Sequence, residues 1–450
     1  MAIDARVKDV ALTTEEFRYR AAIKFGGVAL DRVTLLHAAV TVELGDGRVA
    51  RGRGSMPLGN VWAFPSRSLS YSQTLGAMRA VADEIAVIYT RSTVAGHPID
   101  ITHALEPEFA TAADHVARRH DLGEPIPTLA TLVAASPIDA ALHDAYGKAL
   151  GLNAFRTLTP EFLRHDLGHY LGAEFAGLRL HDYVRPTPQA TMPVYHLVGA
   201  LDRLTTADAG TTADDGLSDT LAEWIAADGL THLKVKLAGD DFAWDLARVL
   251  GVNAVAEAAR TGGPWAYSLD FNERCPDAAY LVELLTRLKE ASPRAYDRVQ
   301  YVEQPTARDL AANRHNAMHA AAALKPVVID ESLVGLESLK LAREMGYTGA
   351  AFKACKGQTQ TLLLAAAAQV YGLYRCVQDL TCPGAALVQS AALAAHLPGV
   401  AAVEANARQY VPAANAGWEA RFPGLFTVRG GVLATGQLTG VGLGATPEGQ

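Results

Sequence analysis

A regular alternation of short apolar runs and helical runs between residues 190 and 409 constrains the fold more than any other feature. The apolar runs have the length and β-branched content of buried strands, and the runs between them carry alanine and leucine at helical spacing. We expect strands at residues 192–198, 232–237, 266–272, 299–303, 326–331, 350–353, 375–379 and 400–404. We expect helices at residues 241–259, 277–290, 333–344, 359–371 and 385–396. This pattern predicts an α/β fold, a TIM-type (β/α)₈ barrel. The alternative, an open doubly wound sheet, has no GxGxxG or phosphate-binding loop to support it.

Five consecutive predicted strands end on charged residues after otherwise apolar runs. In strand order, these residues are Lys234 and Lys236, Asp270, Glu303, Asp330 and Lys353. Catalytic groups of TIM barrels lie at the carboxyl ends of the strands. We therefore expect these side chains to meet at one end of the barrel.

The lysines of the second strand suit proton transfer. Lys234 and Lys236 are two residues apart, so both side chains point to the same side of the strand. Two neighbouring ammonium groups beside a dication predict a lowered pKa on at least one of them, as a general base requires. Taken alone, the motif is also compatible with a strand that faces solvent. Lys353 lies four strands further round the barrel, where it would face Lys236 across the mouth.

Three carboxylates follow at adjacent strand ends. Asp270, Glu303 and Asp330 are spaced by roughly 30 residues, about one β/α unit each. An all-oxygen set of anions suits a hard cation such as Mg²⁺. A metal there would bind a substrate carboxylate and stabilise the enediolate that forms when the α-proton leaves.

The rest of the chain predicts a second, α+β unit. Residues 31–54 have the pattern of a hairpin, and residues 72–89 and 137–150 have that of helices, the latter ended by Gly151. We expect residues 1–155 to form a capping domain, completed by the glycine-rich segment 410–450, and residues 190–409 to form the barrel. Residues 156–189 are expected to form a surface connection, with His165 and His169 as a weaker candidate metal pair.

Composition narrows the cellular context. The net charge of −8 argues against nucleic acid and anionic membranes as partners, and no apolar run reaches the roughly 20 residues that span a bilayer. The four cysteines form no CxxC pair, and the first residues lack the apolar core of a signal peptide. We expect a cytoplasmic protein that acts on a small-molecule carboxylate and assembles as a homo-oligomer.

As a set, these motifs resemble the enolase superfamily, and within it the mandelate racemase/muconate lactonizing enzyme family. The resemblance covers residues 20–445 and includes the helix at residues 138–151. It implies a modified (β/α)₇β barrel, Lys236 and Lys353 as acid/bases, Mg²⁺ on Asp270, Glu303 and Asp330, and two cap loops that select the substrate. Candidate substrate contacts are Lys24, Phe25, Asn60 and Trp62 in these loops and Asn272, Lys356, Asp379 and Glu404 at strand ends.

The sequence also departs from the family pattern. Lys356-Gly357-Gln358 replaces a Gly-Gly pair after the sixth strand, and Glu404-Ala-Asn406 replaces the Asp-x-Asp of dipeptide epimerases. Gln378-Asp379 stands where mandelate-racemase-like members have a histidine. Three functions stay open: racemisation or epimerisation by 1,1-proton transfer, a lyase reaction (dehydration or cycloisomerisation) at the same site, and a non-catalytic binding barrel.

Overall fold

The computed structural model describes residues 3–25, 28–209, 213 and 215–444. Eight parallel strands form a closed barrel, in which each strand pairs with the next along the chain and the last pairs with the first. They are β4 (Met192–Val198), β5 (His232–Lys236), β6 (Ala266–Asp270), β7 (Val299–Glu303), β8 (Val327–Ile329), β9 (Gly349–Lys353), β10 (Tyr374–Gln378) and β11 (Val403–Glu404). The predicted barrel is confirmed, and β4 and β7 begin and end at the predicted residues.

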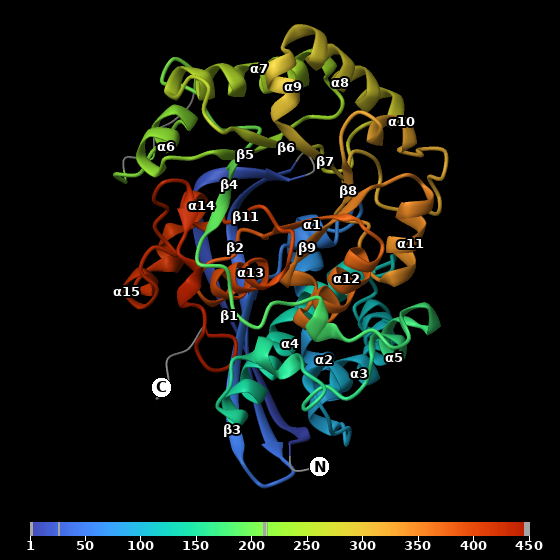
Figure 1. The fold of residues 1–450 in the computed structure, drawn as a ribbon. Helices are drawn as coiled ribbons and strands as arrows, with labels where there is room; N and C mark the ends of the chain where they lie inside the picture. The colour runs from blue at the N-terminus through green and yellow to red at the C-terminus, as the bar shows by residue number, and fades with distance from the viewer. Residues whose placement is uncertain (1–2, 26–27, 210–212, 214, 445–450) are drawn as a thin grey trace.

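Helices follow the barrel strands and cover them on the outside (Figure 1). They are α6 (Leu221–Asp228), α7 (Phe242–Ala259), α8 (Ala278–Ala291), α9 (Pro293–Arg298), α10 (His319–Ala322), α11 (Leu336–Glu344), α12 (Gln358–Val370) and α13 (Ala385–His396). Below the strand ends, the interior is filled by a packed layer of Tyr195, Tyr301, Val328, Ala351, Cys376 and Ala402. The barrel is therefore a solid core, with space for chemistry only at its ends.

A three-stranded antiparallel sheet and the helices that follow it form the N-terminal part of the described chain. They are β1 (Ala5–Phe25), β2 (Val28–Leu44), β3 (Val49–Pro57), α1 (Asn60–Ala63), α2 (Tyr71–Arg91), α3 (Pro98–Arg119) and α4 (Thr128–Leu150). The predicted hairpin corresponds to β2 and β3. The sequence reasoning missed β1 and α3. It also began the last helix nine residues late, because Pro137 lies inside α4. Gly151 ends that helix with a φ of 67°, as predicted.

Helix α4 joins the sheet to the barrel, and its residues are buried on nearly every side. Its contact with β3 depends on glycine. A Cβ atom at Gly52 would lie 2.1 Å from the carbonyl oxygen of Ala141, and one at Gly54 would lie 2.1 Å from that of Pro137. Backbone therefore packs directly on backbone at this contact.

The segment at residues 156–189 is more buried than a surface connection. It forms η1 (Ala154–Leu158), α5 (Leu167–Leu171), η2 (Ala173–Phe175) and η3 (Leu180–Asp182), and Leu163, Leu167 and Phe175 belong to the main core. The rings of His165 and His169 stack at 3.9 Å. Among the described residues, neither belongs to a group of three or more candidate metal ligands.

The last described residues contact both the barrel and the capping part of the chain. A short helix, η4 (Ala354–Lys356), follows β9 in the barrel. The last elements of the described chain are α14 (Ala407–Tyr410), η5 (Pro412–Asn415), α15 (Trp418–Arg421), β12 (Val432–Leu433) and η6 (Thr435–Gln437). Strand β12 pairs with β4, and the backbone N–H of Leu443 donates to Asp144 of α4. Within the described residues, no helix has the length and apolarity needed to cross a membrane.

Candidate active site

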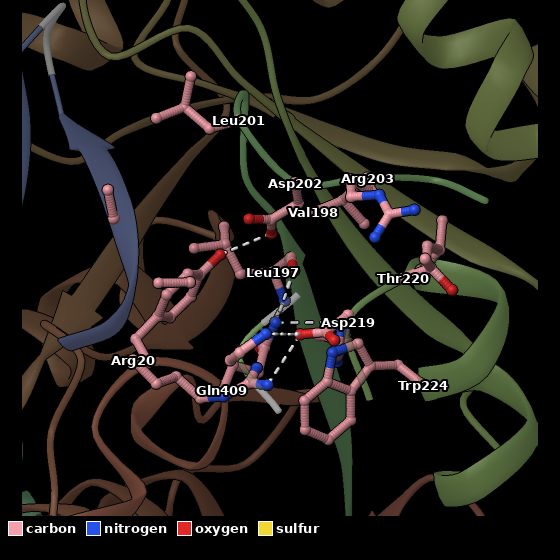
Figure 2. Close-up of a pocket in the computed structure, with 16 residues that line it drawn as sticks. Arg20, Leu197, Val198, Leu201, Asp202, Arg203, Asp219, Thr220, Trp224 and Gln409 are labelled. Atoms are coloured by element: carbon pink, nitrogen blue, oxygen red, sulfur yellow. Dashed lines mark hydrogen bonds and ion pairs between the residues drawn. The ribbon is translucent and has the colours of Figure 1, made fainter. Parts of the chain in front are cut away.

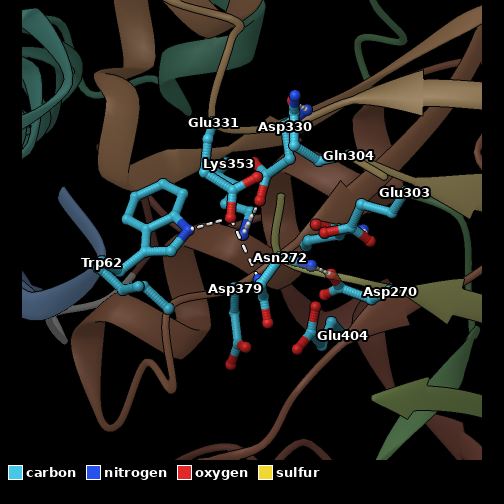
Figure 3. Close-up of polar contacts among 12 residues, drawn as sticks. Trp62, Asp270, Asn272, Glu303, Gln304, Asp330, Glu331, Lys353, Asp379 and Glu404 are labelled. Atoms are coloured by element: carbon cyan, nitrogen blue, oxygen red, sulfur yellow. Dashed lines mark hydrogen bonds and ion pairs between the residues drawn. The ribbon is translucent and has the colours of Figure 1, made fainter. Parts of the chain in front are cut away.

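The charged strand ends of the barrel converge on one buried cluster (Figure 3). Its members include the four lysines and six carboxyl groups Lys234, Lys236, Lys353, Lys356, Asp270, Glu303, Asp330, Glu331, Asp379 and Glu404, and each is at most 6% exposed. Charges buried to this degree persist only when they are paired. The geometry of the pairs therefore defines the site.

Lys234 lies among three carboxylates. Its Nζ atom is 3.0 Å from oxygens of Asp270, Glu303 and Glu404. Burial disfavours its ammonium form, but the charges of Glu303, Glu404 and Asp270 raise its pKa well above the usual value. The pKa of Lys234 is raised because carboxylates outnumber its cationic neighbours, and the lowering expected on at least one of the two lysines beside a dication stays a prediction.

Lys236 and Lys353 lie at the ends of β5 and β9, four strands apart in the eight-stranded barrel. The Nζ atom of Lys236 is 2.5 Å from Asp270 Oδ2 and donates to Asn272 Oδ1 at 2.7 Å. The Nζ atom of Lys353 is 2.8 Å from Asp330 Oδ2. Burial opposes charge on Lys353, whereas Asp330 acts to raise its pKa, and the net shift is upward. The two lysines thus bind different carboxylates of one cluster.

The pKa values of the three predicted metal ligands shift in different directions. Burial and the charge of Asp270 raise the pKa of Glu303 well above its usual value. Burial also acts to raise the pKa of Asp270, but Lys236 and Lys234 hold it below its ordinary range. Lys353 and Lys356 likewise overcome burial and lower the pKa of Asp330 to about 2. Of the three carboxylates, Glu303 is therefore the one whose negative charge is least compensated by nearby lysines.

Trp62 enters this cluster from the capping part of the chain. Its indole N–H donates to Glu331 Oε1 at 2.9 Å, and its ring centroid lies 4.6 Å from Lys353 Nζ and 5.9 Å from Lys356 Nζ. Lys356 also donates to Asp330 Oδ1 at 3.1 Å. Trp62 thus covers the Lys353 side of the cluster through a hydrogen bond and cation–π contacts.

Glu404 and Asp379 form a second hydrogen-bonded group within the cluster. The side-chain amide of Asn406 donates to Glu404 Oε1 and, at 3.2 Å, to Asp379 Oδ1. Burial and the charge of Glu404 raise the pKa of Asp379 to about 7. Both predicted strand-end residues therefore belong to the cluster, linked by Asn406.

Three loop candidates remain to be placed: Asn60, Lys24 and Phe25. The side-chain amide of Asn60 donates to Tyr71 O and Thr74 Oγ1, so it holds its loop to α2. Lys24 and Phe25 end β1 beside residues that are not described, and their side chains lie outside the described residues.

Sequence reasoning missed several members of the cluster. Glu331 accepts from Trp62 and from Asn272, and burial with the charge of Asp330 raises its pKa to about 7. Gln378 donates to Glu303 Oε2. Glu331 and Gln378 stand at or next to the ends of predicted strands, and this position is the signal that could have identified them. Backbone strain marks the same region, because Asn272, Glu273 and Gln304 have φ values of 43°, 69° and 31°.

The carboxylates suit a divalent metal by their chemistry. As the side chains stand, the described residues contain no group of three or more carboxyl, imidazole or thiol groups placed to hold a metal ion. Lys234 instead lies 3.0 Å from both Asp270 and Glu303. The donors are nevertheless all hard oxygens, and six buried carboxyl groups face four ammonium groups. Of the three predicted ligands, Glu303 has a raised pKa, and a dication beside these hard oxygens would stabilise its ionised form, so the residues fit Mg²⁺.

Two of the cavities beside the barrel lie near the ends of β4, β5 and β6. One, of about 340 Å³, is lined by Lys236, Asn272, Phe271, Trp244 and Arg274, and so opens onto the cluster. The other, of about 300 Å³, lies between β1, β4 and α6 (Figure 2). Its polar groups bind one another, as in the pairs Arg20–Asp219 and Tyr410–Asp202. It contains none of the strand-end lysines.

Comparison with known proteins identifies the family. The model described as enolase C-terminal domain-like matches residues 216–450. The chain therefore belongs to the enolase superfamily, and the expectation of an enzyme of its isomerase or lyase class is confirmed. No curated protein matches the sequence significantly.

Solved structures agree on the fold. Dipeptide epimerase from Enterococcus faecalis V583, complexed with Mg and the dipeptide L-Leu-L-Tyr, matches with a TM-score of 0.62 at 15% identity, over 98% of this chain and 99% of that one. Muconate lactonizing enzyme from Pseudomonas fluorescens, complexed with muconolactone, matches with a TM-score of 0.60 at 18% identity, over 99% of this chain and 97% of that one. An enolase from Bradyrhizobium, complexed with magnesium and mandelic acid, matches with a TM-score of 0.60 at 17% identity, over 99% of this chain and 97% of that one.

Proposed function

We propose that this protein abstracts the α-proton of a small carboxylate substrate with the help of Mg²⁺, and that it racemises or epimerises that carbon. The observation that carries the proposal is the placement of Lys236 and Lys353 four strands apart around one buried carboxylate cluster. A substrate carbon between them would have an amine on each face. One lysine would take the proton, and the other would return a proton to the opposite face.

Asp270, Glu303 and Asp330 would hold the metal, because their strands are neighbours and their oxygens are hard donors. A bound Mg²⁺ supplies positive charge that stabilises the enediolate form of the substrate carboxylate. Lys234 would add a fixed positive charge beside Glu303 and Glu404. Trp62 would keep water away from Lys353, over which its ring lies.

A carboxylate substrate is favoured by two observations. The cavity beside Lys236, of about 340 Å³, has room for a small organic acid. Two of the similar structures contain a dipeptide and mandelic acid, both of which carry a carboxylate next to a carbon-bound proton.

A lyase reaction is the alternative at the same site. Dehydration or cycloisomerisation would use the same enediolate, with one lysine as base and the other as acid. The two classes differ in their products, since dehydration removes a water from the substrate and epimerisation leaves the composition unchanged.

An isotope screen tests the proposal. The protein would be incubated with Mg²⁺ in D₂O and with pools of sugar acids, N-acyl amino acids, dipeptides and proline derivatives, and mass spectrometry would detect α-deuterium. We expect exchange without loss of water for one class of acid, abolished by EDTA and, in Lys236→Ala, lost from one configuration of that acid. Loss of water would identify the lyase reaction instead.

The matched control is Lys8→Ala, because Lys8 is an exposed lysine that pairs with Glu43 on the capping sheet. It should exchange deuterium like the unmodified protein. Full exchange in Lys236→Ala and in Lys353→Ala would refute the two-lysine mechanism. Silence across the pools, together with no calorimetric Mg²⁺ binding, would favour a non-catalytic barrel.

A further inference from the structure

Arg308, in the loop after β7, has no part in the proposed proton transfer, yet its side chain joins two distant segments of the chain. Its guanidinium binds both oxygens of Glu273, with Nε 2.8 Å from Oε1 and Nη2 2.5 Å from Oε2. Its Nη1 atom donates to the backbone oxygen of Trp62 at 3.1 Å. Glu273 is 35 residues away, just after β6, and Trp62 is 246 residues away in the capping part. One side chain therefore connects two segments that border the active site.

The barrel holds Arg308 in place. Its backbone N–H donates to Glu273 Oε1 at 2.7 Å, and its carbonyl oxygen accepts from Ser332 Oγ at 2.9 Å. Ser332 Oγ accepts in turn from Gln304 Nε2 at 2.8 Å, and Gln304 directly follows β7. Only 24% of the Arg308 side chain is exposed. The guanidinium is therefore presented by a hydrogen-bonded rim of the barrel.

The contact with Glu273 supports a strained turn at residues 271–275, which we call the β6 turn. Asn272 and Glu273 have φ values of 43° and 69°, in the left-handed region that costs free energy in residues other than glycine. Such a conformation persists only where surrounding contacts hold it. Asn272 of the same turn accepts from Lys236 Nζ at 2.7 Å. The place of Asn272 beside Lys236 therefore depends on the contact that Arg308 makes with Glu273.

The contact with Trp62 holds residues 59–64, the capping loop. Trp62 is 4% exposed, its ring lies over Lys353, and its indole N–H donates to Glu331 (Figure 3). Glu331 thus binds the side chain of Trp62, whereas Arg308 binds its main chain. A charged donor makes the stronger kind of hydrogen bond. The position of the capping loop on the barrel therefore depends on Arg308 as well as on Glu331.

We propose that Arg308 is a positioning residue that couples the two sides of the active site. Through the β6 turn, its guanidinium places Asn272 beside Lys236. Through the capping loop, it places Trp62 over Lys353. The planar fork of arginine suits this task, because it binds a carboxylate with two nitrogens and donates from the third. The catalytic consequence rests on the proposed function, whereas the coupling of the two segments does not.

Hydrogen–deuterium exchange of the full chain, without substrate or metal, tests the coupling apart from any activity. Arg308→Met keeps an aliphatic side chain and removes every donor. Peptide mass spectrometry should show the backbone amides of residues 59–64 and 271–275 exchanging about tenfold faster, because both segments lose a hydrogen bond from a charged donor. Exchange in α12 should be unchanged. Arg308→Lys keeps a charged donor, so both segments should be less affected than in Arg308→Met.

The matched control is Arg314→Met, because Arg314 is an exposed arginine whose Nη1 atom lies 3.6 Å from Glu344 Oε2. It should leave both segments unchanged. Unchanged exchange in either segment of Arg308→Met would overturn the proposal. Equally faster exchange throughout the chain would also overturn it, since that result would indicate a loss of overall stability.

A kinetic measurement checks the consequence for the reaction. With the acid identified by the isotope screen, α-deuterium exchange of each configuration would be measured at saturating acid. In Arg308→Met we expect both configurations to slow by a similar factor of about ten, because both lysines lose a positioned neighbour. Slowing of one configuration alone would overturn the coupling. If the unmodified protein exchanges no acid, the proposed function fails, and the amide exchange of the two segments still decides the role of Arg308.

Discussion

At the scale of single residues, the site is decided by how buried charges pair. The sequence predicted which lysines and carboxylates end the strands, because each follows an apolar run. It did not predict their pKa shifts, since these depend on contacts such as those of Lys234 with Glu303 and Glu404, 69 and 170 residues away. These carboxylates raise the pKa of Lys234, and the lowering expected on at least one of the two lysines beside a dication stays a prediction.

Replacing Trp62 by phenylalanine tests the contact between the capping loop and the barrel. The ring over Lys353 stays, but the N–H that donates to the buried Glu331 is lost. We expect the free energy of unfolding to fall by about 1–3 kcal/mol, measured by urea denaturation. In Trp244→Phe the loss should be smaller, because no described residue accepts from that indole nitrogen. Equal losses would contradict the role of Glu331.

His396 predicts a pH dependence of stability. Burial lowers its pKa to about 4, and its ring stacks on Phe155 at 3.7 Å. In the unfolded chain, His396 binds a proton more tightly than in the folded protein. The contribution of neutral His396 to the free energy of unfolding is therefore complete above about pH 6.5 and is lost as the pH falls towards 4. The shift corresponds to about 3 kcal/mol. Denaturation would be measured at pH 7.5, 5.5 and 4.5. The free energy of unfolding of His396→Leu should fall less with decreasing pH than that of the unmodified protein. Parallel curves would contradict the assignment.

At the scale of elements, periodic segments were predictable and polar or interrupted ones were not. The barrel strands are short and apolar, so their positions were readable to within a few residues. Strand β1 carries charged side chains along its length, and Pro107 interrupts the pattern of α3. Residues 156–189 lack a period of their own, and only the folded structure shows that Leu167 and Phe175 enter the core.

The packing of β3 on α4 gives a prediction with an internal control. Alanine at Gly54 would place a Cβ atom 2.1 Å from Pro137 O and force the two elements apart. We expect a loss of about 3 kcal/mol in the free energy of unfolding. Alanine at Gly76 in α2 meets nothing within 4 Å and should stabilise the protein by about 0.5–1 kcal/mol. Chemical denaturation of both variants measures the difference, and a loss at Gly76 as large as that at Gly54 would contradict this explanation.

At the scale of the whole molecule, the barrel gathers groups that lie far apart in the sequence. Counting strands was enough to predict that Lys236 and Lys353 lie on opposite sides. The entry of Trp62 was named as a candidate, but its partner Glu331 was not. The raised pKa of Glu303 follows from its burial beside Asp270, and it emerges only when the cluster is assembled. Assembly as a homo-oligomer and a cytoplasmic location stay predictions.

The most direct test of the account follows each α-proton separately. With the acid identified by the isotope screen, deuterium exchange would be measured on each of its two configurations with Lys236→Ala and with Lys353→Ala. The account predicts that each variant loses exchange of one configuration, that the lost configuration differs between the variants, and that neither interconverts the two. Interconversion that persists in either variant would contradict the assignment of two opposed lysines.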